Sequence, residues 1–209
     1  MDNQDYKTEL WQSISFRDDM NAFESLFHLL NKRLIQFCSL YVHRIEIAEE
    51  VVADVFVKCW EGRKAMQEIK NIESYLFIAV KNHSINYLKK YSGITSAQLE
   101  EGNKYEIPDL FDPEKRLELK ELSFRMEQAI ESLPLQSRLV FRLVKEDGMK
   151  YKDVAEILSI SPRTVQTQLY RAIKKLSHIF SAYQTQICKN KIVSIVMLTG
   201  VLQIIFSSL

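Results

Sequence analysis

The sequence predicts an all-helical fold, and three observations support that prediction. The chain has 209 residues, of which 46% are hydrophobic and 26% charged, so it carries enough apolar surface to bury a core. It has only 5 glycines and 4 prolines, too few for the closely spaced turns of sandwiches and barrels or for a glycine-rich phosphate loop. Apolar residues recur at the three- and four-residue spacing of a helical face along most of the chain.

The first half of the chain contains three predicted helices. Apolar residues repeat with helical spacing across residues 20–42, 47–62 and 72–88. Three helices with short connections can bury one core. We therefore expect a small helical domain over residues 21–91, preceded by an N-terminal segment, residues 1–20.

Residues 92–114 differ in composition from their neighbours. They hold six acidic residues against one lysine, together with Pro108 and Pro113, which is typical of a flexible acidic linker. Charge is also uneven elsewhere: residues 1–63 carry a net charge of −4 and residues 149–175 of +4, although the whole chain carries +1. The two ends are therefore expected to meet different partners.

A second helical domain is predicted over residues 115–180. Its first helix ends near Leu133 and Pro134, the next spans about residues 135–146, and a short one covers residues 151–158. Ser161 and Pro162 then open a further helix. Ser161 is placed to accept an orphan backbone N–H, and Pro162 lies at the first helical position, where its missing N–H costs nothing.

The short helix, the turn and the capped second helix match a helix-turn-helix, which lays its second helix in the DNA major groove. If Val165, Leu169, Ala172 and Leu176 face inward, the outer face is basic and hydrogen-bonding, with no acidic residue. Such side chains suit base edges and phosphates, although a solvated amphipathic surface is the alternative. The candidate DNA-binding residues are Arg163, Thr164, Gln166, Thr167, Tyr170, Arg171 and Lys174.

The order of motifs resembles the extracytoplasmic-function (ECF) sigma factors of bacterial RNA polymerase, from the sigma-70 superfamily. GMKYKDVAEIL at 148–158, SPRTV at 161–165 and LYRA at 169–172 look like their region 4. AEEVVADVFVKCW at 48–60 looks like region 2.2, and SYLFIAVKN at 74–82 with NYLKK at 86–90 looks like regions 2.3 and 2.4. The resemblance covers residues 21 to 180 and implies that the helix-turn-helix binds the promoter −35 element.

The resemblance also implies two further interfaces in the first domain. The helix at 48–60 would bind a coiled coil of the largest subunit of core RNA polymerase, through Glu49, Asp54, Lys58 and Trp60, while Val51, Val55 and Phe56 are expected to be core. A loop at 62–71 would take a flipped base of the −10 element, at a cost of a few kcal/mol of lost stacking. The expected −10 contacts are Lys81, Asn82, Asn86, Lys89 and Lys90, with the lysines on phosphates.

Two segments keep alternative interpretations. The acidic linker either threads the interior channel of polymerase, as in the family, or is a solvated tether. The tail, residues 181–209, is expected to form an apolar C-terminal helix, and residues 192–209 contain no charged residue. Its length reaches the lower edge for spanning a bilayer, so residues 190–209 would associate with a membrane or, as we favour, pack against protein.

The sequence thus predicts a two-domain transcription initiation factor and not an enzyme. Its partners would be core RNA polymerase, promoter DNA and an anti-sigma factor, often a membrane protein in this family. The scattered histidines and three distant cysteines suggest no metal, no disulfide framework and no cofactor, in a reducing cytoplasm. The rivals are a stand-alone helix-turn-helix regulator, which would carry a sensor or dimerisation domain in place of residues 21–91, and a membrane-tethered interaction protein.

Overall fold

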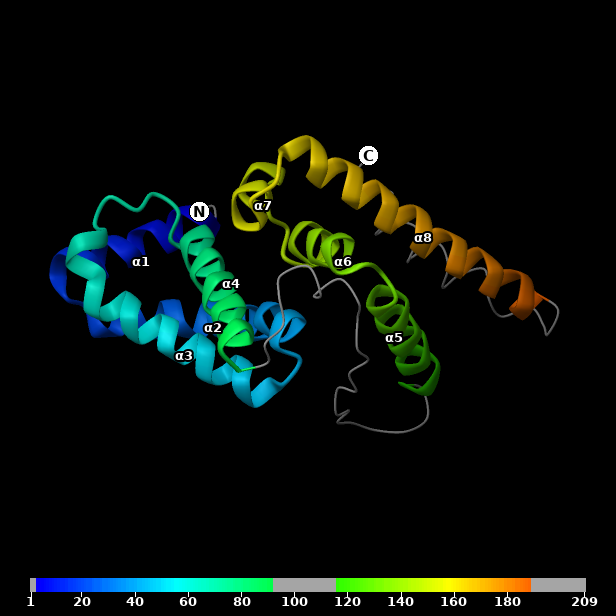
Figure 1. Cartoon of the computed structure of the whole chain (residues 1–209), viewed down its shortest axis with the longest axis horizontal. Helices are drawn as coiled ribbons and strands as arrows, with labels where there is room; N and C mark the ends of the chain where they lie inside the picture. Colours follow the sequence, from blue (N-terminus) through cyan, green and yellow to red (C-terminus); the bar gives the residue numbers. More distant parts are fainter. Residues whose placement is uncertain (1–2, 92–115, 189–209) are drawn as a thin grey trace.

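The computed structural model describes residues 3–91 and 116–188, which form helices and no strand (Figure 1). The first bundle, called the N-terminal bundle below, consists of α1 (Asn3–Arg17), α2 (Met20–Val42), α3 (Ile45–Gly62), the short 3-10 helix η1 (Arg63–Met66) and α4 (Ile72–Tyr91). The second, the C-terminal bundle, consists of α5 (Arg116–Glu131), α6 (Leu135–Phe141), the π-helical segment η3 (Arg142–Glu146), α7 (Tyr151–Leu158) and α8 (Pro162–Cys188). The predicted all-helical class is confirmed.

Helix α2 illustrates how local sequence sets the boundaries. The Asp19 carboxylate accepts the backbone N–H groups of Asn21 and Ala22 at 3.0 and 3.1 Å, which satisfies two donors that the first turn leaves unpaired. The helix ends where His43 turns left-handed, with φ 60°. Between these points Leu26, Leu30 and Leu34 are fully buried, as the apolar spacing predicts.

The sequence did not predict helix α1. Lys7, Leu10, Trp11 and Ile14 have the spacing of one helical face and are all buried. The stripe is short and includes a lysine, so it does not stand out by hydrophobicity. Its burial shows that the first residues of the chain complete the N-terminal bundle.

The core of the N-terminal bundle lies between α2, α3 and α4. Val51, Val55 and Phe56 of α3 are buried, as predicted, and Phe27 packs against Phe56 with ring centroids 4.9 Å apart. Two free cysteines lie in the same core. Burial raises the pKa of the Cys38 thiol to about 11 and that of Cys59 to about 12, so both stay protonated at neutral pH.

The C-terminal bundle packs α6 and α7 against α8. The predicted inner stripe of Val165, Leu169, Ala172 and Leu176 is buried throughout. The helix predicted at 135–146 is α-helical only to Phe141 and continues as the π-helical η3. There the Asp147 N–H donates to the Arg142 carbonyl at 2.9 Å, and the wider turn brings Asp147 toward the other bundle.

The two bundles contact each other through four linked charges, of which Lys7 and Glu73 are buried and Arg33 and Asp147 are half-buried. The Lys7 ammonium of α1 lies 2.5 Å from the Glu73 carboxylate of α4, which also pairs with Arg33 of α2. Arg33 Nε donates to Asp147 at 2.5 Å across the boundary between the bundles. These four charges alternate in sign from Lys7 to Asp147, so each carboxylate is neutralised by an adjacent cation.

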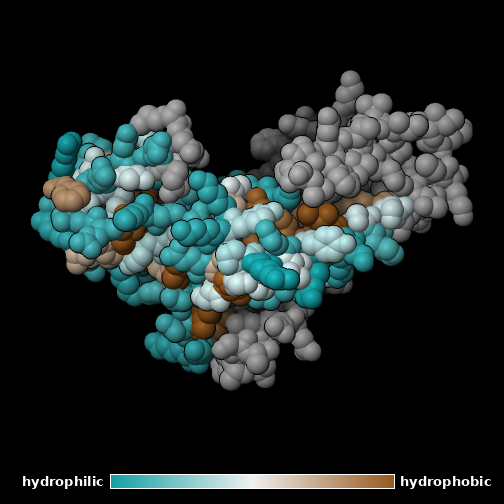
Figure 2. Space-filling model, turned by 90° about the horizontal axis from the view of Figure 1, so that it is seen from above, coloured by the Kyte–Doolittle hydropathy of each residue, from teal (hydrophilic) through white to brown (hydrophobic). Residues whose placement is uncertain are grey.

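Two of the predicted segments, the acidic linker and the apolar tail at 190–209, lie outside the described residues. Among the helices between residues 3 and 188 that the structure describes, none is long and apolar enough to cross a membrane. On the face shown in Figure 2 the described surface is mostly hydrophilic, with hydrophobic residues in strips between hydrophilic ones.

We expect Glu73→Gln to destabilise the chain strongly. It removes the carboxylate that neutralises both Lys7 and Arg33, and leaving buried charge unpaired costs about 3–5 kcal/mol. Urea unfolding would measure the loss. The control is Glu24→Gln at an exposed i, i+4 pair with His28, expected to change the unfolding free energy by less than about 0.5 kcal/mol. Equal effects of the two variants would refute the role given to Glu73.

Candidate nucleic-acid interface

The turn between α7 and α8 is fixed by its own hydrogen bonds. Ser159 is left-handed, with φ 58°, and its N–H donates to the Glu156 carbonyl at 3.2 Å, while the Ile160 N–H donates to that of Ala155 at 2.9 Å. This pairing closes the C-terminal end of α7. Two residues later Ser161 Oγ accepts the Thr164 N–H at 3.0 Å, as the predicted N-cap of α8 requires.

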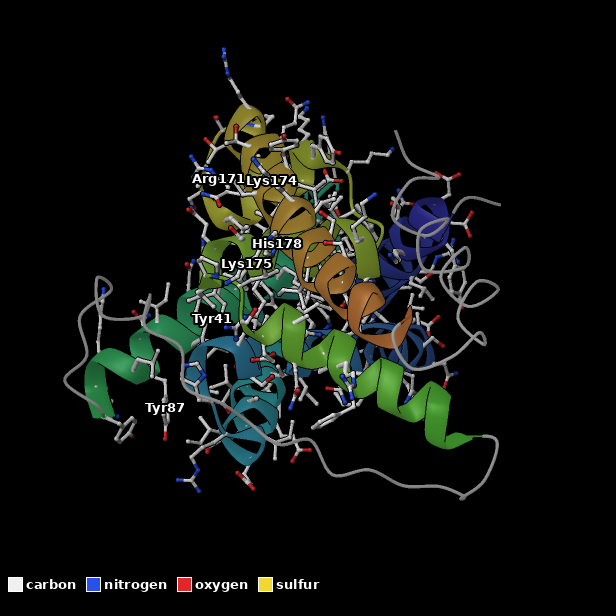
Figure 3. The ribbon with its side chains drawn as sticks, turned by 90° about the vertical axis from the view of Figure 1, so that its right-hand side faces the viewer. Tyr41, Tyr87, Arg171, Lys174, Lys175 and His178 are labelled. Carbon is white, nitrogen blue, oxygen red and sulfur yellow. The ribbon has the colours of Figure 1, made fainter. Side chains whose placement is uncertain are left out.

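The outer face of α8 is exposed to solvent, as the predicted contacts with DNA require. Arg163, Gln166, Arg171 and Lys174 are exposed, and Tyr170 retains 67% of its accessible surface. Within the described part of the chain, the four polar side chains have no hydrogen-bond or ion-pair partner. They are therefore free to contact a ligand. Figure 3 places Arg171, Lys174, Lys175 and His178 along α8.

The two threonines of this face are already engaged. The Thr164 hydroxyl lies 2.8 Å from Ser161 Oγ, and Thr164 is only half exposed. The Thr167 hydroxyl donates to the Arg163 carbonyl at 3.0 Å. Thr164 thus belongs to the helix cap in this structure, and Thr167 offers a methyl group and lone pairs rather than a donor.

A groove of 370 Å³ lies beside this face, between the start of α6 and α8. Arg171 and Lys175 line it together with Ser137 and Gln168. Lys175 donates to the Ser132 carbonyl at 2.5 Å and so joins α8 to the end of α5. Lys175 extends the cationic surface beyond the predicted residues; it follows Arg171 at helical spacing, a signal available in the sequence.

The predicted −10 residues all lie on α4, but they differ in how far their side chains are exposed to solvent. Asn82, Asn86, Lys89 and Lys90 are exposed. Lys81 is buried, with 9% of its surface accessible, because its ammonium donates to the Ile157 carbonyl at 2.6 Å and to Ser159 Oγ at 2.9 Å. In this arrangement Lys81 contacts the helix-turn-helix instead of solvent.

The end of α4 carries an aromatic pair that was not predicted. Tyr87 is half-buried and lies against Tyr91, with ring centroids 4.7 Å apart, and Lys90 Nζ lies 4.9 Å from the Tyr91 ring centre. Aromatic faces beside a cation are suited to stacking unpaired bases. Tyr87 is only partly covered by the bundle, so the exposed part of its ring leaves a face for contact.

The loop between α3 and α4 is held by α1. The Trp11 indole N–H donates to the Met66 carbonyl at 3.2 Å, and Gln67 Nε2 donates to the Ser15 carbonyl at 3.0 Å. Asp18 accepts from Arg63 at 2.6 Å and lies 3.1 Å from the Lys64 ammonium, and these two cations lower its pKa. These contacts therefore fix the position of the loop within the N-terminal bundle.

Helix α3 presents the predicted protein-binding residues on one exposed face. Glu49, Asp54 and Lys58 are exposed, and Val57 between them keeps 55% of its surface accessible. Trp60 is half-buried: its ring packs on Phe23 at 5.0 Å and lies under the Arg63 guanidinium at 4.0 Å. The sequence did not single out Val57, the apolar centre of this mainly acidic face.

Models of known protein families match both bundles. The family model "Sigma-70 region 2" matches residues 26–93, and "Sigma-70, region 4" matches residues 123–176. Together they cover more than half of the chain, in the order that the motifs predict. Helices α2–α4 carry the first match, and the helix-turn-helix lies within the second.

Proteins with similar sequences are named RNA polymerase sigma factors. The RNA polymerase sigma-H factor of Pseudomonas aeruginosa is 24% identical over 75% of this chain and 84% of its own length. The ECF RNA polymerase sigma-E factor of Escherichia coli is also 24% identical, over 75% and 85%. The ECF RNA polymerase sigma factor SigW of Bacillus subtilis is 23% identical, over 77% and 89%.

Solved structures support the fold. CnrH in complex with the cytosolic domain of CnrY matches with a TM-score of 0.57 and 21% identity, over 85% of this chain and 98% of that one. The sigma factor RpoE of Bartonella quintana, in complex with the anti-sigma factor NepR, matches with a TM-score of 0.54 and 19% identity, over 76% and 96%. With both family models matched in order, this chain belongs to the ECF sigma factors of the sigma-70 family.

Proposed function

We propose that this chain binds core RNA polymerase and directs it to promoters by contacting their −35 and −10 elements. The observation that carries the proposal is the outer face of α8, which is exposed, basic and free of acidic residues. The opposite face of α8 is a buried apolar stripe and its first turn is capped, so a rigid helix carries the exposed side chains. The site of action would be the cytoplasm.

At the −35 element, Arg171 and Arg163 are the residues with the geometry for guanine, since the guanidinium group can donate to two acceptors on one base edge. Gln166 can pair with adenine, and Lys174 can neutralise a phosphate. Thr164 would act mainly as the cap partner, and Thr167 and Tyr170 by packing against the DNA. No cofactor enters this role.

At the −10 element, Asn82 and Asn86 supply exposed amides and Lys89 and Lys90 supply phosphate contacts. A flipped base needs contacts worth a few kcal/mol to replace lost stacking. The anchored loop at 62–71 and the Tyr87–Tyr91 pair are suited to supply them. Strand opening would then follow from preferential binding of the separated strand.

For polymerase, the exposed face of α3 fits a partner helix that is basic around an apolar centre. Glu49, Asp54 and Lys58 surround Val57 there. Trp60 would contribute through its accessible edge while holding Phe23 and Arg63.

We infer that an anti-sigma factor also binds this chain. The Bartonella sigma factor was solved with the anti-sigma factor NepR, and CnrH was solved with the cytosolic domain of CnrY. That this partner is a membrane protein stays a prediction. The packing of residues 190–209 against protein, favoured over membrane association, also stays a prediction, because these residues lie outside the described ranges.

The direct test is transcription in vitro with purified core RNA polymerase. The full chain is expected to co-elute with the core enzyme and to start transcripts from a defined promoter. A chain that fails to co-elute but binds duplex DNA as a dimer would instead be a stand-alone helix-turn-helix regulator.

We expect Arg171→Ala to weaken binding of the holoenzyme to its promoter by about 1–3 kcal/mol and to relax discrimination at one −35 base pair. Competition binding against single-base promoter variants would measure both. Arg44→Ala is the matched control, since Arg44 is exposed on the N-terminal bundle and lies 3.8 Å from Glu46. An equal loss on every sequence would make Arg171 a phosphate contact and refute the base-reading role.

We expect Asp54→Lys to raise the Kd for core polymerase by at least about tenfold, because it reverses one charge next to Val57, the apolar centre of the α3 face. Fluorescence anisotropy with labelled chain and purified core enzyme would give the constant. Glu24→Lys makes the same change on exposed α2 and should leave the Kd unchanged. If the two variants behave alike, the α3 face is not the docking surface.

A further inference from the structure

One backbone carbonyl is shared between the loop that joins α3 to α4 and helix α1. The Met66 carbonyl accepts the Ile69 N–H at 3.1 Å, which closes the turn after η1, and it also accepts the Trp11 indole N–H at 3.2 Å. A carbonyl oxygen has two lone pairs, so both are used here. The turn of the loop is therefore bonded directly to a side chain of α1.

The loop is also bonded to the end of α1 on either side of Met66. Before it, Arg63 Nε donates to the Asp18 carboxylate at 2.6 Å, in the turn that follows α1. After it, the Gln67 amide donates to the Ser15 carbonyl at 3.0 Å. Figure 1 shows the loop running beside α1. Three successive parts of the loop are thus attached to one short stretch of chain.

The side chain of Met66 packs against the start of the loop. It lies so close to Gly62 that a Cβ atom at that position would overlap it. The absence of a side chain at Gly62 therefore lets the loop fold back on the end of α3, and the Trp11 N–H then holds the carbonyl of the same methionine.

Trp11 holds the loop from within the bundle. Only 1% of its surface is accessible, and it lies in the buried stripe of α1 with Leu10 and Ile14. The exposed side chains of the loop are Lys64, Ala65, Gln67, Glu68 and Lys70. A ligand at the loop would meet those side chains and the backbone between them, so Trp11 could act on the ligand only through the loop.

The family match does not include the partners of the loop on α1. The Sigma-70 region 2 model matches residues 26–93, whereas α1 spans Asn3–Arg17. Trp11, Ser15 and Asp18 all precede the matched residues. The loop itself lies inside the match, so a matched segment is held by residues that the match leaves out.

We propose that α1 sets the conformation in which the loop at 62–71 receives a base of the −10 element, with Trp11 as the positioning residue. The proposal rests on the −10 role given to the loop above. A loop held in one conformation loses less freedom when a base enters, and a pocket whose supporting contacts are fixed discriminates better between bases. Helix α1 would thus control −10 specificity while touching neither DNA nor polymerase.

The test compares Trp11→Phe with wild type in the full-length chain bound to core RNA polymerase. Phenylalanine keeps an aromatic ring in the core and removes the N–H that holds Met66. Tyr41→Phe is the matched control, because it also removes a polar group from a buried ring of the same bundle. Tyr41 lies at the end of α2 that is farther from Asp18.

Selection from a promoter pool measures the effect. The holoenzyme is mixed with a promoter that it transcribes, in which the −10 positions are randomised and the −35 element is constant, and the bound DNA is sequenced. At the position where wild type is most selective, the ratio of the most to the least enriched base should fall about threefold to tenfold for Trp11→Phe, as expected for one lost hydrogen bond. Tyr41→Phe should keep the wild-type ratio.

Two further measurements separate a positioning role from a general loss of structure. The Kd for core enzyme and the base ratios from a second pool, randomised at the −35 element, should be unchanged for Trp11→Phe. A change of similar size in either of them overturns the proposal. An unchanged −10 ratio for Trp11→Phe, or an equal fall for Tyr41→Phe, overturns it as well.

A second variant covers the case in which Trp11→Phe shows no cooperative unfolding transition. Asp18→Asn then replaces it, with the same expected fall and the same criteria. Asp18 is exposed, its substitution removes the charge that pairs with Arg63, and asparagine suits the left-handed backbone at this position, with φ 57°.

The wild-type result distinguishes this proposal from the proposed function. A wild-type holoenzyme with no preference at any −10 position refutes the −10 role, and the positioning role with it. A wild-type preference that the Trp11→Phe holoenzyme retains in full refutes the positioning role alone and leaves the proposed function standing.

Discussion

The arrangement of the helices depends on the linked charges of Lys7, Glu73, Arg33 and Asp147, two of them buried and two half-buried. They come from α1, α4, α2 and the turn before α7, so one connected set of ion pairs spans both bundles. Buried ion pairs add little net stability compared with apolar packing, because desolvation offsets their attraction. They do penalise every arrangement that separates one charge from its partner, and hence they select among the ways in which apolar faces could pack.

Helix α4 shows how one helix serves several needs without conflict. Leu76, Phe77 and Val80 face the core, Lys81 contacts the C-terminal bundle, and Asn82 and Asn86 are exposed. The three sets occupy different sides of the helix. A substitution on one side can therefore be assigned to packing, to the interface between bundles or to a ligand.

The local sequence was sufficient to predict most of the helices and the residues on the outer face of α8. The spacing of Leu26, Leu30 and Leu34 and the cap at Ser161 each act within one helix, so periodicity and capping rules identify them. The rest depends on pairs far apart in the chain: Lys7 and Glu73 are 66 residues apart, Arg33 and Asp147 114. No local pattern reports such pairs, and for this reason α1, η3 and the burial of Lys81 were missed.

The predicted DNA-binding surfaces on α8 and α4 differ in how accessible they are. The outer face of α8 is supported by its own bundle and needs no rearrangement to meet duplex DNA. Lys81 of α4, in contrast, is covered by α7. Under the proposed function, the exposed residues Asn82, Asn86, Lys89 and Lys90 therefore carry the −10 contacts that this arrangement leaves available, and Lys81 supports the packing of α7 instead.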